Sequence, residues 1–114
     1  GCSSLQTLSL EHVLTVGDGA FLSCSKLALI TLQICQTIGN SAFKNCTSLV
    51  SIAFKCVKTL GDDAFSDCTN LTSINLPVCE VVGFKTFYNC AVKELYLNCE
   101  KLSGETIVEK GGKT

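Results

Sequence analysis

Gly39-Asn-Ser-Ala-Phe43-Lys-Asn-Cys46-Thr-Ser-Leu49-Val-Ser-Ile52 decides the fold of this 114-residue chain, because close copies of it recur along the sequence. The preceding copy is Gly17-Asp-Gly-Ala-Phe21-Leu-Ser-Cys24, and the following copy is Gly61-Asp-Asp-Ala-Phe65-Ser-Asp-Cys68. Five cysteines occupy one position of the repeat, each 22 residues after the last: Cys2, Cys24, Cys46, Cys68 and Cys90. A fixed period of this length is typical of solenoids, in which each unit packs on its neighbours.

Each unit carries an alternating apolar pattern after its cysteine, such as Leu27, Ile30 and Leu32 in the second unit. This pattern predicts a half-buried strand. Successive strands are expected to pair in parallel about 4.8 Å apart, in one curved sheet on the concave side of the solenoid. A fifth, degenerate unit follows Cys90, with its strand pattern one residue early.

The Gly-x-x-Ala-Phe segment predicts the convex side. The repeated glycine favours a left-handed or a close-packed backbone. Asp18, Asn40 or Asp62 then follows and is expected to cap a short 3₁₀ or α-helical turn. The phenylalanines at one repeat position are expected to stack as an aromatic row: Phe21, Phe43, Phe65 and Phe87.

The predicted fold class is therefore an α/β repeat solenoid over residues 1–108, with about five units of 22 residues, and a frayed tail over residues 109–114. The chain begins Gly1-Cys2-Ser3-Ser4 and contains no methionine. We expect it to be an excised or processed segment of a longer protein.

The unit Gly-x-x-Ala-Phe-x-x-Cys-x-x-Leu-x-x-Ile-x-Leu resembles the BspA-like class of leucine-rich repeats over about residues 2–97. The resemblance implies a leucine-rich-repeat arc that is displayed on a cell surface or secreted, with roles in adhesion and in binding host proteins. It implies no catalytic residue. One departure from the family pattern is that only Pro77 keeps the proline that usually follows the strand.

Composition excludes some partners. The formal charge is −1, with nine lysines and no arginine, which argues against nucleic acid. No run of about 18 apolar residues is present, so insertion into a membrane is not expected.

Nine cysteines would ordinarily suggest disulfides or a metal site. Stacked in register, however, the five repeated cysteines would point the same way about 4.8 Å apart, whereas a disulfide needs converging Cβ atoms about 3.8 Å apart. We expect a ladder of buried free thiols, and abundant free thiols leave an intracellular location open. No Cys-x₂₋₄-Cys pair is present and His12 is the single histidine, so neither metal nor cofactor is predicted.

Four further cysteines follow the strands. Cys35 and Cys79 are expected to face inward, at a position that commonly satisfies turn amides in leucine-rich repeats. Cys56 and Cys99 either face outward, where they would be the most reactive thiols, or are tucked in by a local slip of one residue.

Three other patterns resemble functional sites. The tail Gly111-Gly112-Lys113-Thr114 lacks the upstream glycine of a phosphate-binding loop, because position 107 is isoleucine. Asn45-Cys-Thr47 and Asn70-Leu-Thr72 fit the N-glycosylation pattern, whose use would require a secreted eukaryotic protein. The potential acid–base residues form no catalytic constellation, and solvation or capping explains them: His12, Asp62, Asp63 and Asp67.

The concave strand face is the remaining candidate, because solenoids bind partners along such faces. We expect its partner-binding residues to be Leu29, Thr31, Val50, Ala53, Asn75 and Tyr96. Tyr96 is the preferred anchor, since aromatic rings dominate interface energetics. An unused, weakly polar sheet face is the plain alternative.

Two functions follow from these observations. The first is a non-enzymatic protein-binding or adhesion module, and the second is a structural spacer or intracellular scaffold segment of a longer repeat protein without a ligand of its own. Leu5, Leu8 and Leu10 leave one end of the stack uncapped, so self-association through the ends is also expected.

Overall fold

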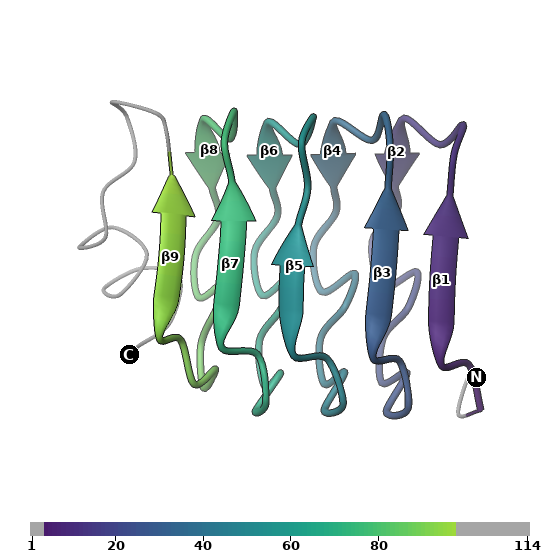
Figure 1. Ribbon diagram of the computed structural model, residues 1–114, viewed down its shortest axis with the longest axis vertical. Helices are drawn as coiled ribbons and strands as arrows, with labels where there is room; N and C mark the ends of the chain where they lie inside the picture. Colours follow the sequence, from purple (N-terminus) through teal and green to yellow (C-terminus); the bar gives the residue numbers. More distant parts are fainter. Residues whose placement is uncertain (1–3, 98–114) are drawn as a thin grey trace.

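Two rows of parallel strands run the length of the molecule on opposite sides of one core (Figure 1). The computed structural model describes residues 4–97, with side chains as far as Glu94. The front row of Figure 1 contains the longer strands β1 (Thr7–Leu10), β3 (Leu29–Leu32), β5 (Ser51–Ala53), β7 (Ser73–Leu76) and β9 (Glu94–Leu97). The back row contains β2 (Thr15–Val16), β4 (Thr37–Ile38), β6 (Thr59–Leu60) and β8 (Val81–Val82). This arrangement confirms the parallel-sheet solenoid.

The register follows the repeat. Leu8 pairs with Ile30 in the front row, and Ile38 pairs with Leu60 in the back row, in both cases 22 residues later. Ser73 pairs with Glu94, 21 residues later, because the fifth unit has lost one residue in the turn after Cys90. Equivalent side chains therefore lie directly above one another, and their inward members form the core between the two rows.

The front row is not the single sheet that the repeat predicts. Strands β1 and β3 form one sheet and β5, β7 and β9 form another, whereas the back row is continuous from β2 to β8. Figure 1 shows β3 and β5 further apart than the other front neighbours. We call this break the front opening. Phe54 is fully buried here at the position that Leu32 and Leu76 occupy in their units, and we attribute the opening to the larger volume of its ring.

The predicted aromatic row is confirmed. The ring centroids of Phe21 and Phe43 lie 5.3 Å apart, those of Phe43 and Phe65 5.2 Å, and those of Phe65 and Phe87 5.7 Å. The planes of these pairs differ by only 9° to 12°. Phe43, Phe65 and Phe87 are fully buried, while Phe21 at the end of the row is only half-buried.

The expected helical turns are not confirmed. Over residues 4–97 the Ala-Phe segments are turns, and no helix is present there. Alternate backbone donors bond to the neighbouring unit: Phe43 N–H donates to Ala64 O and Phe65 N–H to Thr86 O, both at 2.8 Å. The donors between them bond within the turn, as Ala64 N–H does to Gly61 O at 3.3 Å. Because the Phe43 and Phe65 donors are used between units, they are not available for bonds within a helical turn. No helix within residues 4–97 is long and apolar enough to cross a membrane.

Close packing, and not a left-handed backbone, requires glycine at positions 39, 61 and 83, whereas a Cβ atom on Gly17 would meet nothing within 4 Å. A Cβ atom on Gly61 would lie 2.6 Å from the backbone nitrogen of Asn40, and Gly83 is crowded in the same way by Asp62. The left-handed residues are elsewhere in the unit, including Asn45 at φ 64° and Asp67 at φ 61°. Of the two interpretations of the repeated glycines, the close-packed one is therefore right.

Asp18, Asn40 and Asp62 connect units and do not cap helices. Asn40 N–H donates to Asp18 Oδ1, Asp62 N–H donates to Asn40 Oδ1, and Phe84 N–H donates to Asp62 Oδ1, each at 2.8 Å. We call this series the Asx ladder. It is an exposed counterpart of the buried aromatic row, and both hold one unit to the next.

Candidate functional site

The outward surface of the front strands, which the front opening divides, is called the strand face. Alternation along β3 buries Ile30 and Leu32 and exposes Leu29 and Thr31. Val50, Ala53 and Asn75 are also exposed. Tyr96 lies in β9, where its backbone pairs with Asn75, but its side chain lies outside the described residues. The structure thus places the backbones of all six predicted binding residues on this face or beside it.

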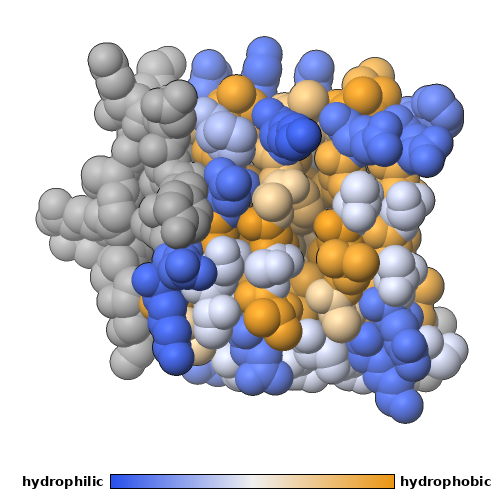
Figure 2. All heavy atoms as spheres, viewed as in Figure 1, coloured by the Kyte–Doolittle hydropathy of each residue, from blue (hydrophilic) through white to orange (hydrophobic). Residues whose placement is uncertain are grey.

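Apolar side chains gather in the middle of the strand face. Leu29 is 54% exposed and Val50 is 51% exposed, although both are large and apolar. Figure 2 shows orange side chains over the central strands, with blue polar side chains at the upper and lower margins. An exposed apolar patch within a polar rim is a common arrangement of protein-interaction surfaces.

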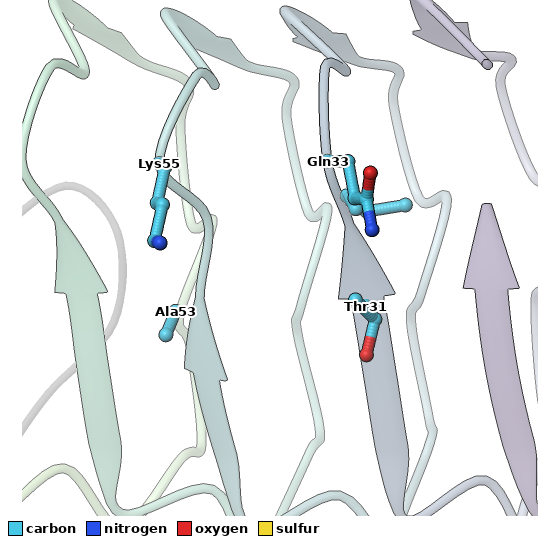
Figure 3. Close-up of a pocket in the computed structure, with 5 residues that line it drawn as sticks. Thr31, Gln33, Ala53 and Lys55 are labelled. Carbon is cyan, nitrogen blue, oxygen red and sulfur yellow. The ribbon is translucent and has the colours of Figure 1, made fainter. Parts of the chain in front are cut away.

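A shallow hollow of about 380 Å³ lies at the front opening. Its lining comes from the ends of two strands: Thr31, Leu32 and Gln33 from the β3 side, and Ala53 and Lys55 from the β5 side. Figure 3 shows Thr31 and Gln33 on one side of the space between the strands and Ala53 and Lys55 on the other. Sequence reasoning included Thr31 and Ala53 but missed Gln33 and Lys55, because both lie just beyond the alternating strand pattern.

The ladder thiols pack as predicted in three described units. Cys46, Cys68 and Cys90 are buried and free, and each Sγ–H donates to the carbonyl of Phe21, Phe43 or Phe65 respectively, at 3.4, 3.2 and 3.1 Å. Burial raises the pKa of Cys46 to about 12, with a smaller effect from the neighbouring Cys68. A hydrogen bond with Cys90, followed by burial, raises the pKa of Cys68. Protonated buried thiols of this kind are poor nucleophiles.

The prediction of a wholly free ladder is wrong at Cys24, which is disulfide-bonded. Unit spacing of about 4.8 Å falls within the Cα separation that disulfides tolerate, so stacking opposes the bond less strongly than parallel side-chain directions suggest. Cys2 and Cys99 lie outside the described residues.

The other described cysteines also donate to carbonyls. Cys35 and Cys79 face inward as predicted. Cys35 Sγ–H donates to Thr37 O at 3.3 Å, and Cys79 Sγ–H donates to Val81 O at 3.5 Å. Burial raises the pKa of Cys35. Cys56 is half-buried, and its Sγ–H donates to Gln33 O at 3.4 Å. The structure therefore favours the partly tucked position over a fully outward one.

The remaining candidates have structural explanations or lie outside the described range. Asp62 is part of the Asx ladder, Asp67 Oδ1 accepts from Asn89 Nδ2, and His12 is exposed. No group of three potential metal-ligating side chains occurs among the described residues. The Gly111–Thr114 tail lies beyond them.

The two glycosylation patterns have accessible asparagines whose side chains are already in use. Asn45 Nδ2 donates to Ser23 Oγ at 3.3 Å, and Asn70 Nδ2 donates to Thr47 O at 2.8 Å. Both side chains are exposed. Attachment of a glycan at either nitrogen would change a bond between units.

An aromatic pair on the back of the fourth unit was missed. Phe84 is 60% exposed and Tyr88 is 48% exposed, and Lys85 Nζ lies 5.6 Å and 5.2 Å from their ring centroids. The signal was available in the repeat, since Phe84 replaces the Asp or Asn that precedes it in the Asx ladder. Phe84 has no side-chain oxygen with which to continue that ladder.

Comparison with known proteins identifies relatives of this architecture. The family model described as a BspA type leucine-rich repeat region matches residues 1–107 in six copies, one more than the five units counted from the cysteines. A crystal structure of a leucine-rich repeat protein from Bacteroides ovatus is 31% identical, with a TM-score of 0.71, and the match covers 90% of this chain and 25% of that one.

A second structure, of a leucine-rich cell surface protein from Faecalibacterium prausnitzii, is 18% identical with a TM-score of 0.47. That match covers 87% of this chain and 41% of the other. This chain thus spans a quarter of the first protein and about two-fifths of the second. No curated protein matches the chain.

Proposed function

We propose that this chain, which belongs to the BspA type leucine-rich repeat family, is a non-enzymatic protein-binding and adhesion module that uses its strand face. Leucine-rich repeat proteins are generally non-enzymatic and generally mediate protein–protein interactions. The proposal adds to these family properties a particular surface, an adhesive role and a place at the cell surface or outside the cell.

The observation that carries the proposal is the pair of large apolar side chains on the strand face. Leu29 and Val50 are both more than half exposed, on neighbouring units whose other outward residues are small or weakly polar. Burying both against a partner would remove apolar area from water, with a contribution of about 25 cal/mol per Å². Proposed contacts around this pair are Thr31, Ala53 and Asn75, with Tyr96 on the fifth unit.

The disulfide at Cys24 supports a location outside the reducing cytosol, because disulfides persist mainly in oxidising compartments. The free thiols at Cys46, Cys68 and Cys90 are compatible with such a location. They are buried, so oxidants in solution have little access to them.

A random library of 12-residue peptides displayed on phage provides the test. Peptides selected on the native chain are expected to lose binding to a Leu29→Asp/Val50→Asp double variant whose thermal midpoint is unchanged. The matched control is Val81→Asp, which changes an exposed valine of the back row. If every selected peptide binds the double variant as well as the native chain, the strand face is the wrong surface and the spacer interpretation is favoured.

A further inference from the structure

The front opening breaks a contact that other unit junctions share. Three junctions share an equivalent backbone bond at the start of their front strands. These bonds are Ala28 N–H to Gln6 O at 2.9 Å, Thr72 N–H to Val50 O at 2.8 Å, and Lys93 N–H to Thr72 O at 2.8 Å. The equivalent bond, from Val50 N–H to Ala28 O, is missing from this part of the described chain. Both strands at the opening therefore present an edge without a strand partner.

A second pair of backbone groups faces the hollow. At the next junction Phe54 N–H donates to Asn75 O at 3.1 Å. The equivalent groups at the opening are Leu32 N–H and Ala53 O, which the alternation of parallel strands directs toward each other. Leu32 and Ala53 both line the hollow, so these groups lie at its wall.

The opening is confined to the front row. The back row remains paired behind it, with Lys58 N–H donating to Gln36 O at 2.8 Å. The rings of Phe43 and Phe65, which belong to the same two units, stay 5.2 Å apart. An inserted strand would require twice the normal spacing, or about 9.6 Å. The paired back row and the closely stacked rings oppose such a separation, so we consider a side chain as the occupant.

The positive charge of Lys55 at the edge of the hollow indicates which kind of partner side chain would bind there. Lys55 is exposed at one side of the hollow, and the polar side chains of Thr31 and Gln33 line the other side (Figure 3). An ammonium group and a backbone N–H on an edge without a strand partner together favour an oxygen acceptor with negative charge. Leu29 and Val50 lie on the same face and favour apolar neighbours for that acceptor.

We propose that the front opening receives an aspartate or glutamate side chain from an apolar segment of the protein that binds the strand face. The carboxylate accepts hydrogen bonds from Lys55 Nζ and Leu32 N–H. This inference rests on the proposed function, to which it adds the chemistry of the partner.

The peptides selected on the native chain test the inference. We expect them to share an acidic residue, and Lys55→Met to weaken their binding about tenfold or more, as loss of a charge-assisted hydrogen bond does. Replacing the acidic residue of the peptide by its amide should cause a similar loss on the native chain and little further loss on Lys55→Met. Lys58→Met is the matched control and should leave binding unchanged.

The Phe54→Leu variant tests the opening itself. Leucine restores the residue found in neighbouring units, so we expect β3 and β5 to pair, the Val50 and Leu32 amides to exchange more slowly with deuterium, and peptide binding to weaken. Unchanged binding after the amides become protected would overturn the inference. The inference would also be overturned if the Val50 amide of the native chain exchanged with deuterium as slowly as the Thr72 amide.

The outcomes separate the two proposals. If binding requires Leu29 and Val50 but is indifferent to Lys55 and to the peptide carboxylate, the acidic-group inference fails and the strand-face function stands. If binding is indifferent to Leu29 and Val50, the proposed function fails.

Discussion

Asn40 Oδ1 accepts a hydrogen bond from the backbone N–H of Asp62, 22 residues later, at 2.8 Å. The same geometry joins Asp18 to Asn40 and Asp62 to Phe84. A polar side chain in one unit thereby fixes the turn of the next, at the exposed edge of each junction. Stability therefore depends on paired surface residues as well as on the core.

Replacing Asn40 by alanine is expected to lower the free energy of unfolding by about 1 kcal/mol, the usual net value of one such hydrogen bond. Asn40→Asp should retain most of the stability, because aspartate serves at the equivalent positions 18 and 62. Urea denaturation monitored by circular dichroism measures both. Equal stability of Asn40→Ala and the native chain would show that the Asx ladder contributes nothing.

Replacing Phe65 by alanine is expected to destabilise the chain by about 3–5 kcal/mol, because the ring is fully buried and removal leaves a cavity. Its ring contacts Phe43, Phe54 and Phe87, so repacking cannot easily fill the space. The control is Phe84→Ala, which removes an exposed ring and should cost less than about 1 kcal/mol. Comparable losses in the two variants would contradict the aromatic row as the centre of packing.

Thiol labelling should distinguish Cys24 from the other described cysteines. In denaturant without reductant, we expect alkylation of the six free thiols: Cys35, Cys46, Cys56, Cys68, Cys79 and Cys90. Cys24 should be alkylated only after reduction. Peptide mass spectrometry identifies each site. In the folded chain, half-buried Cys56 should react first; faster labelling of Cys46 would mean that the ladder is open to solvent.

Alkaline pH should destabilise the chain through its buried thiols. Burial raises the pKa of Cys46 to about 12, whereas an unfolded thiol ionises near 8.5. The folded state therefore holds its proton more tightly, and this contribution to stability is complete below about pH 8.5 and lost as pH rises toward 12. Each such thiol contributes a slope of roughly 1.4 kcal/mol per pH unit within that window.

The measurement compares unfolding free energies from pH 8 to pH 11 for the native chain, Cys46→Ala and Val57→Ala. Cys46→Ala should show the shallower decline with pH. Val57→Ala loses a buried side chain without an ionisable group, so it should be less stable at every pH but keep the native slope. Parallel slopes for all three would exclude this role of Cys46.

The repeat predicts the structural features that all units share. Phe43, Cys46 and Ile52 recur in phase, so their burial, their stacking and the parallel register follow from one period. Contacts between units are harder to predict, because Asn40 has its partner 22 residues away and looks like a local cap in the sequence. The short back strands are not predicted for another reason: a strand of two residues, such as Thr59–Leu60, is too short to show an alternating apolar pattern.

Departures from the repeat explain the rest of the site. The strand alternation identifies Leu29 and Thr31 as outward residues, and their exposure agrees. The hollow, by contrast, depends on the wider spacing of β3 and β5, which we attribute to Phe54 at a position that holds leucine in the neighbouring units. Lys55 is adjacent to Phe54 in the sequence, but its place across the hollow from Gln33 depends on that spacing.

The close packing of successive glycines at positions 39, 61 and 83 affects how the number of repeat units can change. Gly61 packs on Gly39 and Asn40, and Gly83 packs on Gly61 and Asp62, so each junction is built from nearly the same parts. Duplication or loss of a whole unit within this series would recreate a junction of the existing kind, with no new core to evolve. The strand face can therefore lengthen or shorten by whole units, while its individual outward residues remain free to diverge.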